Sequence, residues 1–242
     1  LTDDSMSRME NIIVTLTSGA LANLFARDFA QLWRTREIAE SGAFPTSPAL
    51  LQYEAQPALT DVDFSPGQGE EINERIATRI QNAQERIVIC SMLINSSKLL
   101  RALISQLDRG QVEMSGVYDH TQMMGVLDQW RERPDLAWKI EAVERLIHEA
   151  GLVGKRSEPY RPGESNNFMH NKTLVVDGTV LTGSYNLSHN AQANAENMLA
   201  VQSRRMAGDV VDYTRNLAER FRDQSDSRPA DRHGARHDGA DE

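Results

Sequence analysis

Cysteine is nearly absent from this sequence, which has one, Cys90, among its 242 residues. A single thiol excludes a disulfide bond within the chain. Because the neighbouring apolar residues 87–89 predict a buried strand, we expect Cys90 to be a small core residue and not a reactive thiol. No apolar run approaches the roughly 20 residues of a membrane-spanning helix. Walker loops, dinucleotide fingerprints and cysteine clusters are absent as well.

Positive charge is also scarce. The chain has 26 Lys and Arg against 35 Asp and Glu, a formal net charge of −9. A general nucleic-acid binder needs a basic footprint, so this composition argues against that class while leaving room for a local basic groove. The hydrophobic content of 40% and charged content of 25% are typical of a globular protein, and the length suffices for one large domain or two small ones.

What the sequence does contain is a hairpin pattern with reactive side chains. His170 and Lys172 are two residues apart, so on a strand both side chains leave the same face. The apolar run 174–176 follows and predicts a buried strand. Asp177 and Gly178 then form a dipeptide that strongly favours a two-residue hairpin turn.

The return strand of this hairpin, residues 180–182, is expected to bring small polar groups back beside the histidine, namely Gly183, Ser184 and Asn186. One hairpin would then present a nucleophile or general acid, a fixed positive charge and hydrogen-bonding groups. A phosphodiester is anionic and resists attack, so its cleavage needs these three kinds of group. The set therefore suits phosphodiester chemistry.

The pattern resembles the HKD motif of the phospholipase D superfamily, H-x-K-x4-D followed by G-S-x-N. The matching positions are His170, Lys172, Asp177, Gly183, Ser184 and Asn186. Five residues separate the Asp from the Gly here, one fewer than the family pattern usually has. The resemblance implies an α/β sandwich with a mixed β-sheet flanked by helices. It also implies a phosphohistidine intermediate, one histidine from each of two repeats, and no metal or other cofactor.

The same resemblance assigns roles to individual residues. His170 would supply one of the two histidines, expected to be the general acid/base, although the roles could be reversed. Lys172 would bind phosphate oxygens as a point charge. Asn186 and Ser184 would donate hydrogen bonds to the same oxygens. Asp177, although part of the catalytic motif, is expected to secure the hairpin.

An internal repeat frames this motif. Residues 1–11 align without a gap with residues 187–197, and the Glu-Asn pair at 10–11 matches the pair at 196–197. In both copies a short apolar segment and then an amphipathic helix follow, which favours common descent. We therefore expect the chain to begin just downstream of a first HKD motif that it does not contain.

The repeat also supplies candidates for the group that orients a catalytic histidine through its second ring nitrogen. Glu10 and Glu196 hold matching positions in the two copies. We predict that Glu10 orients His170 across a pseudo-twofold axis, and that Glu196 would orient the absent histidine.

The expected organisation has four parts. Residues 1–40 would be a remnant of the first repeat, 41–60 a linker, 61–223 the second repeat, and 224–242 a disordered tail with almost no apolar residues. In the remnant we expect a strand at 12–16 and a helix at 19–40, capped by Ser18. In the second repeat we expect strands at 62–64, 86–92 and 111–118, helices at 70–83, 99–107, 121–130 and 136–150, and a polar loop at 152–167.

Several functions fit these residues. The first is a hydrolase or transphosphatidylase of phospholipase D type acting on phospholipids; the alternatives are a cardiolipin synthase-type phosphatidyltransferase and a phosphodiesterase nuclease. The partners would be a phospholipid or other phosphodiester, with transient contact to a membrane surface. A first repeat or a second copy would complete the site. No metal site is expected, because His120 beside Asp119 has no second ligand at suitable spacing.

A reading from another class is a non-catalytic fragment or scaffold that carries one HKD motif. Without its sheet neighbours, the predicted helix 19–40 would leave Phe25, Phe29 and Trp33 uncovered. We therefore expect the chain to associate or to dissolve poorly.

Overall fold

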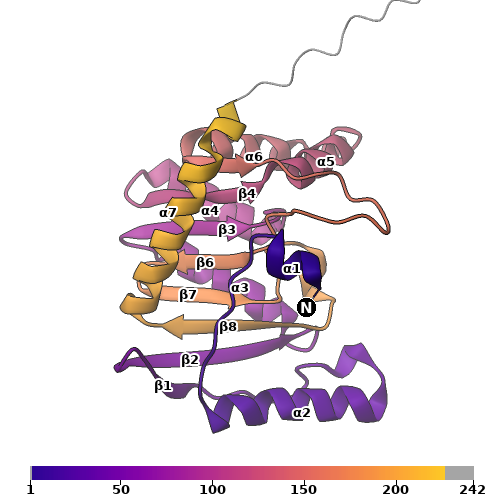
Figure 1. The fold of residues 1–242 in the computed structure, drawn as a ribbon, viewed down its shortest axis with the longest axis vertical. Coiled ribbons are helices and arrows are strands. Elements are labelled where there is room, and N and C mark those ends of the chain that lie inside the picture. Colours follow the sequence, from indigo (N-terminus) through magenta and orange to yellow (C-terminus); the bar gives the residue numbers. More distant parts are fainter. Residues whose placement is uncertain (1, 227–242) are drawn as a thin grey trace, which may run out of the picture.

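The computed structural model describes residues 2–226, in which the strands form one eight-stranded mixed sheet of order β1-β2-β8-β7-β6-β3-β4-β5 (Figure 1). The strands β3, β4 and β5 run parallel, and the other neighbours pair antiparallel. The bounds are β1 (Ala49–Tyr53), β2 (Gln56–Ser65), β3 (Arg86–Ser91), β4 (Glu113–Asp119), β5 (Leu152–Lys155), β6 (Lys172–Val176), β7 (Thr179–Gly183) and β8 (Glu196–Gln202). This confirms the expected α/β fold.

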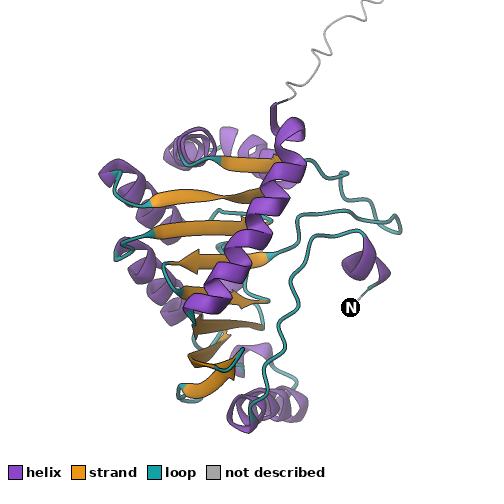
Figure 2. Ribbon diagram, turned by 60° about the vertical axis from the view of Figure 1, so that its left-hand side comes forward, coloured by secondary structure: helices purple, strands orange, loops and turns teal. Residues whose placement is uncertain are grey.

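Helices cover both faces of the sheet. One face carries α3 (Gly69–Gln81), α4 (Ser97–Arg109), α5 (His120–Arg131) and α6 (Ala137–Glu149). The long α7 (Arg204–Asp226) runs across the strands on the opposite face, as Figures 1 and 2 show. The remaining helices are α1 (Asp3–Ser7), α2 (Gly19–Thr35) and the 3-10 turns η1 (Ile38–Glu40), η2 (Pro134–Leu136) and η3 (Asn190–Gln192). None of the described helices combines the length and hydrophobicity that a bilayer crossing requires.

The central strand β6 explains why the apolar run after Lys172 is continuous. Leu174 and Val176 face the core under α3 and α4, and Val175 faces the core under α7. Since both faces of the sheet are covered, successive residues of this strand are buried and the alternation of a half-exposed strand is lost. The hairpin β6–β7 thus lies in the middle of the fold, with its N-terminal end open to the site.

The predicted strand at 12–16 is wrong. Residues 11–18 have no regular secondary structure and cross the α7 face of the sheet in an extended path (Figure 2). Ile12, Val14 and Leu16 pack on the core beneath α7. An extended segment becomes a strand only beside a free strand edge, and here the segment lies over a face. The start of the helix after it is confirmed, since Ser18 caps α2 by accepting from Leu21 N at 3.2 Å, but the helix ends at Thr35 and not at residue 40.

The second half of the predicted linker 41–60 belongs to the sheet. It holds β1 and the first residues of β2, which pair as an antiparallel hairpin and join the main sheet through β8. Ala49 and Leu51 are buried while Leu50 is exposed, a strand alternation that the surrounding prolines obscured.

Two smaller differences concern the second repeat. The polar loop at 152–167 begins with β5, a short strand parallel to β4. At the other end, α7 continues to Asp226, three residues into the expected tail, and the rest of that tail lies outside the described residues.

Candidate active site

The backbone around His170 is held from two sides. Met169 N donates to the Asp119 carboxylate, Oδ2, at 2.8 Å, and Asp119 is fully buried at the end of β4. On the other side, Glu10 N donates to Phe168 O at 3.0 Å and His170 N donates to Glu10 O at 3.2 Å. The N-terminal segment and the core of the sheet together fix where the imidazole projects.

His170 and Lys172 lie together as the spacing predicts. Lys172 Nζ is 3.2 Å from His170 Nε2 and donates to His170 O at 2.9 Å. Burial lowers the pKa of His170 to about 4, and the positive charge of Lys172 acts in the same direction. Burial also lowers the pKa of Lys172 to about 8, against the opposing charge of Glu196. Near neutral pH the imidazole is therefore uncharged and the ammonium is charged.

Both side chains open into a cleft of about 500 Å³ between the N-terminal segment and the hairpin. Ser184 lies in its lining, and Ser184 Oγ accepts from Asn197 N at 3.0 Å and from Asn197 Nδ2 at 3.2 Å. Because a hydroxyl can accept twice and still donate, the Ser184 proton remains available to an oxygen in the cleft. The residues that line the cleft are Thr2, Ser5, Met9, Asn11, Ile12, Ile13, His170, Asn171, Lys172, Thr182, Gly183 and Ser184.

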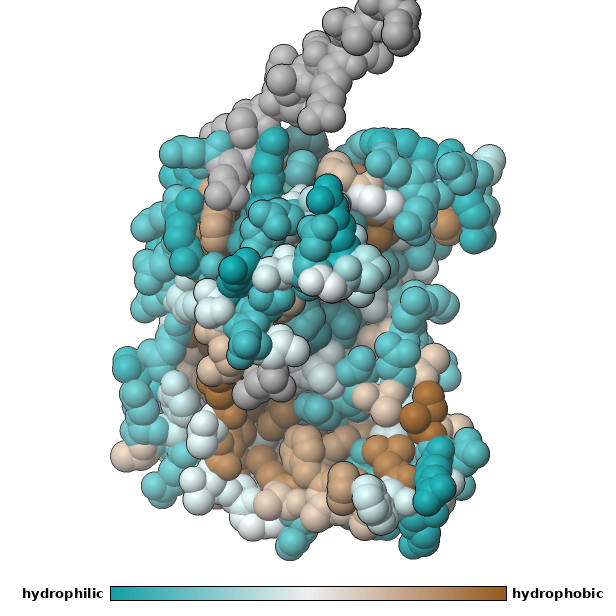
Figure 3. Space-filling view, turned by 45° about the vertical axis from the view of Figure 1, so that its right-hand side comes forward, coloured by the Kyte–Doolittle hydropathy of each residue, from teal (hydrophilic) through white to brown (hydrophobic). Residues whose placement is uncertain are grey.

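The cleft continues into an apolar groove. A second cavity of about 330 Å³ shares Ile12, Thr182 and Gly183 with the cleft and reaches α2. Apolar side chains gather on the lower part of the face drawn in Figure 3, the part of the molecule where Figure 1 places α2. The apolar residues of this groove are Ile12, Val14, Leu16, Leu21, Ala22, Phe25 and Leu199.

Asn186, expected to bind phosphate, and Glu196, expected to orient a histidine, both lie outside the cleft lining. The Oδ1 atom of Asn186 is buried without a hydrogen-bond partner among the described residues. Glu196 opens β8, and its negative charge opposes the lowering of the Lys172 pKa.

Glu10 does not take the position that the repeat predicts. Its carboxylate, Oε2, lies 2.9 Å from Arg220 Nη2, and only its backbone contacts His170. The side chain beside the second ring nitrogen is Asn11, whose Oδ1 is 3.3 Å from His170 Nδ1. Sequence reasoning missed Asn11, although it stands in the same Glu-Asn pair.

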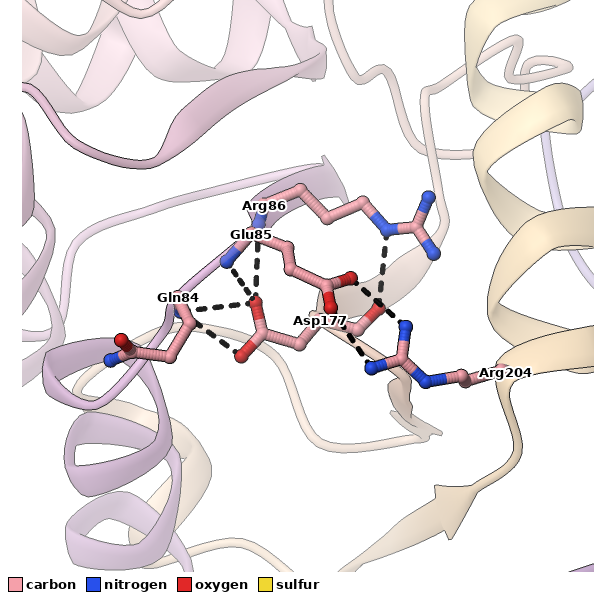
Figure 4. A network of polar contacts seen from close by, with 5 residues as sticks. All are labelled: Gln84, Glu85, Arg86, Asp177 and Arg204. Atoms are coloured by element: carbon pink, nitrogen blue, oxygen red, sulfur yellow. Dashed lines mark hydrogen bonds and ion pairs between the residues drawn. The ribbon is translucent and has the colours of Figure 1, made fainter.

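Asp177 lies at the opposite end of β6 from His170, seven residues along the chain and so about 23 Å away at the rise of a β-strand. Figure 4 shows its carboxylate at the start of β3, where it accepts from the backbone N–H groups of Gln84, Glu85 and Arg86 at 2.8–3.2 Å. Arg86 Nε in turn donates to Asp177 O at 3.2 Å. Asp177 secures the hairpin turn and does not reach the cleft.

Among the residues that the structure describes, no three His, Cys, Asp or Glu side chains converge on one point. Asp119 beside His120 is engaged by Met169 N and by Ser157 Oγ at 2.7 Å.

Comparison with known proteins places this geometry in a family. The family described as "Cardiolipin synthase, PLD-like domain" matches residues 76–220, which include the whole hairpin. The fold is similar to that of NucT from Helicobacter pylori, with 18% identity, a TM-score of 0.52, and coverage of 67% of this chain and 96% of NucT. It is also similar to phosphatidylserine synthase from Haemophilus influenzae Rd KW20, with 20% identity and a TM-score of 0.50. That match covers 81% of this chain and 45% of the synthase. A search of the curated proteins finds no match.

Proposed function

Because this chain belongs to the phospholipase D-like family, we propose that it carries one half of an active site that cleaves phospholipid phosphodiesters through a phosphohistidine intermediate. The observation that carries the proposal is the contact of 3.2 Å between Lys172 Nζ and His170 Nε2 at the wall of an open cleft. A cation and a neutral imidazole at that spacing can hold a phosphoryl oxygen and attack phosphorus at the same time.

The steps follow from these two groups. Lys172 binds the phosphoryl oxygens, with Ser184 Oγ as a further donor. His170 Nε2 attacks phosphorus, a nitrogen–phosphorus bond forms, and the bond to the leaving alcohol breaks. A second histidine protonates the leaving alkoxide and, now neutral, takes the proton of the water or alcohol whose oxygen then cleaves the phosphohistidine. The low pKa of His170 supports the nucleophile role, the reverse of the assignment favoured by its place in the second repeat.

The second histidine has to come from elsewhere. Of the residues that line the cleft in the described range 2–226, His170 is the one histidine. We propose that a first repeat or a second copy of the chain supplies the other, as the internal repeat suggests.

Lipid substrates are favoured by the groove beyond the cleft. A phospholipid carries its phosphodiester at one end and apolar chains at the other, which matches a His-Lys cleft that runs into an apolar groove. The net charge of −9 further disfavours a long polyanion such as DNA.

The test is a single-turnover assay with bis(4-nitrophenyl) phosphate, because 4-nitrophenolate departs without a proton donor. We expect a stoichiometric burst of 4-nitrophenolate in the presence of EDTA, and a matching mass increase of the protein. His170→Ala should abolish both, and Lys172→Ala should weaken the burst strongly. His148→Ala is the matched control. His148 is exposed on α6, a helix that covers the sheet face opposite to α7.

Substrate class and reaction type need a second assay on phosphatidylcholine vesicles, with and without glycerol as acceptor. Phosphatidic acid would indicate hydrolysis, and phosphatidylglycerol would indicate transfer. A burst that survives His170→Ala, or that EDTA removes, would overturn the proposed mechanism.

A further inference from the structure

The amide of Asn11 has only one orientation that satisfies its neighbours. Asn11 Nδ2 donates to the backbone oxygen of Ser5 at 2.8 Å. A carbonyl oxygen can only accept, so the NH2 group must face Ser5 and Oδ1 must face the imidazole of His170, 3.3 Å from Nδ1. The capping box between Thr2 and Ser5 holds α1, and with it the Ser5 carbonyl, in place.

This orientation decides where the imidazole carries its hydrogen. Asn11 Oδ1 is purely an acceptor, so His170 Nδ1 must be the protonated nitrogen. On the far side of the ring, Lys172 Nζ can only donate, so Nε2 must offer its lone pair at 3.2 Å. Two independent neighbours thus favour the same tautomer, and each contributes part of the preference.

We propose that Asn11 is a positioning residue: it fixes His170 in the Nδ1-protonated tautomer and so leaves Nε2 as the nitrogen that attacks phosphorus. The attack rests on the proposed function, whereas the choice of tautomer does not. Neither of the two carboxylates that the repeat nominates performs this role.

An amide in this position has an electrostatic consequence that a carboxylate would reverse. A carboxylate beside Nδ1 would stabilise the imidazolium, raise the pKa of His170 and so leave less uncharged nucleophile at a given pH. The carboxylate of Glu10, the residue before Asn11, is instead paired with Arg220 at 2.9 Å. The imidazole therefore lies between a neutral acceptor and a cation, and the cation, together with burial, favours its uncharged form.

The tautomer can be read directly by long-range ¹H–¹⁵N NMR of the histidine ring nitrogens in the whole chain. His170 signals are assigned by their loss in His170→Gln. At neutral pH we expect a protonated-type shift for Nδ1 and an unprotonated-type shift for Nε2. In Asn11→Ala the two shifts should move toward the average of both tautomers. In the isosteric Asn11→Asp, the titration midpoint of the ring should rise by roughly one to three pH units.

The 4-nitrophenolate burst then measures how much the tautomer contributes to the rate of attack on phosphorus. Asn11→Ala should lower the burst rate constant by roughly ten- to a hundredfold with little change in substrate affinity. Asn11→Asp should keep the geometry and move the acidic limb of the pH profile upward. Asn82→Ala, an exposed asparagine at the end of α3, is the matched control and should behave as the wild type.

The outcomes separate the two proposals. An Nε2-protonated wild type, or an Asn11→Ala spectrum identical to that of the wild type, overturns the role of Asn11 even if the burst is present. The expected tautomer shifts without a burst in any variant would support the positioning of the ring and overturn the proposed function. Circular dichroism of each variant identifies a loss of folding, and the isosteric Asn11→Asp keeps the test decisive in that case.

Discussion

At the scale of single residues, the pair His170 and Lys172 makes opposite demands on pH. Attack on phosphorus needs an uncharged imidazole, and capture of the phosphate needs a charged ammonium. Burial moves both pKa values down, to about 4 for His170 and about 8 for Lys172. The buried setting therefore fits the two groups to one pH window, with the imidazole already free of its proton and the lysine still charged.

This pair predicts a bell-shaped dependence of the burst rate on pH. As the pH rises through about 4, His170 loses its proton and the rate should increase. As the pH rises further through about 8, Lys172 loses its charge and the rate should fall. The measurement is the second-order rate constant for bis(4-nitrophenyl) phosphate as a function of pH.

Lys172→Arg separates the two limbs. A guanidinium stays charged throughout the range, so the alkaline limb should vanish even though the different geometry lowers the rate. An alkaline limb that persists in this variant would show that another group titrates there.

At the scale of elements, the β6–β7 hairpin is fastened at its turn by Asp177. The Asp177 carboxylate accepts three backbone N–H groups, and its own backbone has φ 52°, in the left-handed region. Asp177→Ala should cost about 1–3 kcal/mol of unfolding free energy in chemical denaturation, because those donors lose their acceptor.

Asp177→Asn is the control for that change, since asparagine tolerates positive φ and keeps one oxygen acceptor. Its loss of stability should be smaller. In both variants the burst rate per folded molecule should stay at the wild-type value, because the turn lies at the far end of β6. A selective loss of the burst in Asp177→Ala would place Asp177 in the site after all.

The other end of the hairpin depends on Gly183. Its φ is +149°, and an added Cβ would lie 2.3 Å from Asn197 O, so strand β8 would have to move. Because Asn197 also holds Ser184, Gly183→Ala should lower both the unfolding free energy, by roughly 1–3 kcal/mol, and the burst rate.

A matched glycine shows whether the effect is local. In Gly125→Ala, on α5, the new Cβ meets nothing within 4 Å, and the helix propensity of alanine should leave stability unchanged or increase it by up to about 1 kcal/mol. Equal losses in the two variants would contradict the close approach at Gly183.

At the scale of the whole molecule, the described surface carries apolar side chains that the fold does not cover. Phe29 is 64% exposed and Trp33 is 76% exposed, and their rings stack with centroids 5.9 Å apart. Leu50, on the outer strand β1, is 72% exposed. Exposed apolar area of this kind favours association.

We therefore expect concentration-dependent association of the chain in sedimentation velocity. The double change Phe29→Ser and Trp33→Ser should reduce it without a loss of thermal stability, since neither ring is buried. A monodisperse wild-type monomer at the same concentrations would contradict this prediction.

The sequence by itself determined the hairpin and much of the α/β frame. The signals for the hairpin are all local: the period-two spacing of His170 and Lys172, the buried run after them and the Asp-Gly turn. A local signal can be recognised without knowing which segments pack against it. The helices α3, α4, α5 and α6 followed from their own apolar periodicity for the same reason.

Tertiary structure alone decided which N-terminal side chain meets His170. Neighbouring residues of an extended chain point in opposite directions, so the choice between Glu10 and Asn11 depends on the register of a contact between segments about 160 residues apart. Tertiary structure also decided that residues 12–16 form no strand and that β1 does. Whether an extended segment becomes a strand is set by a free strand edge elsewhere in the chain, and no local pattern contains that information.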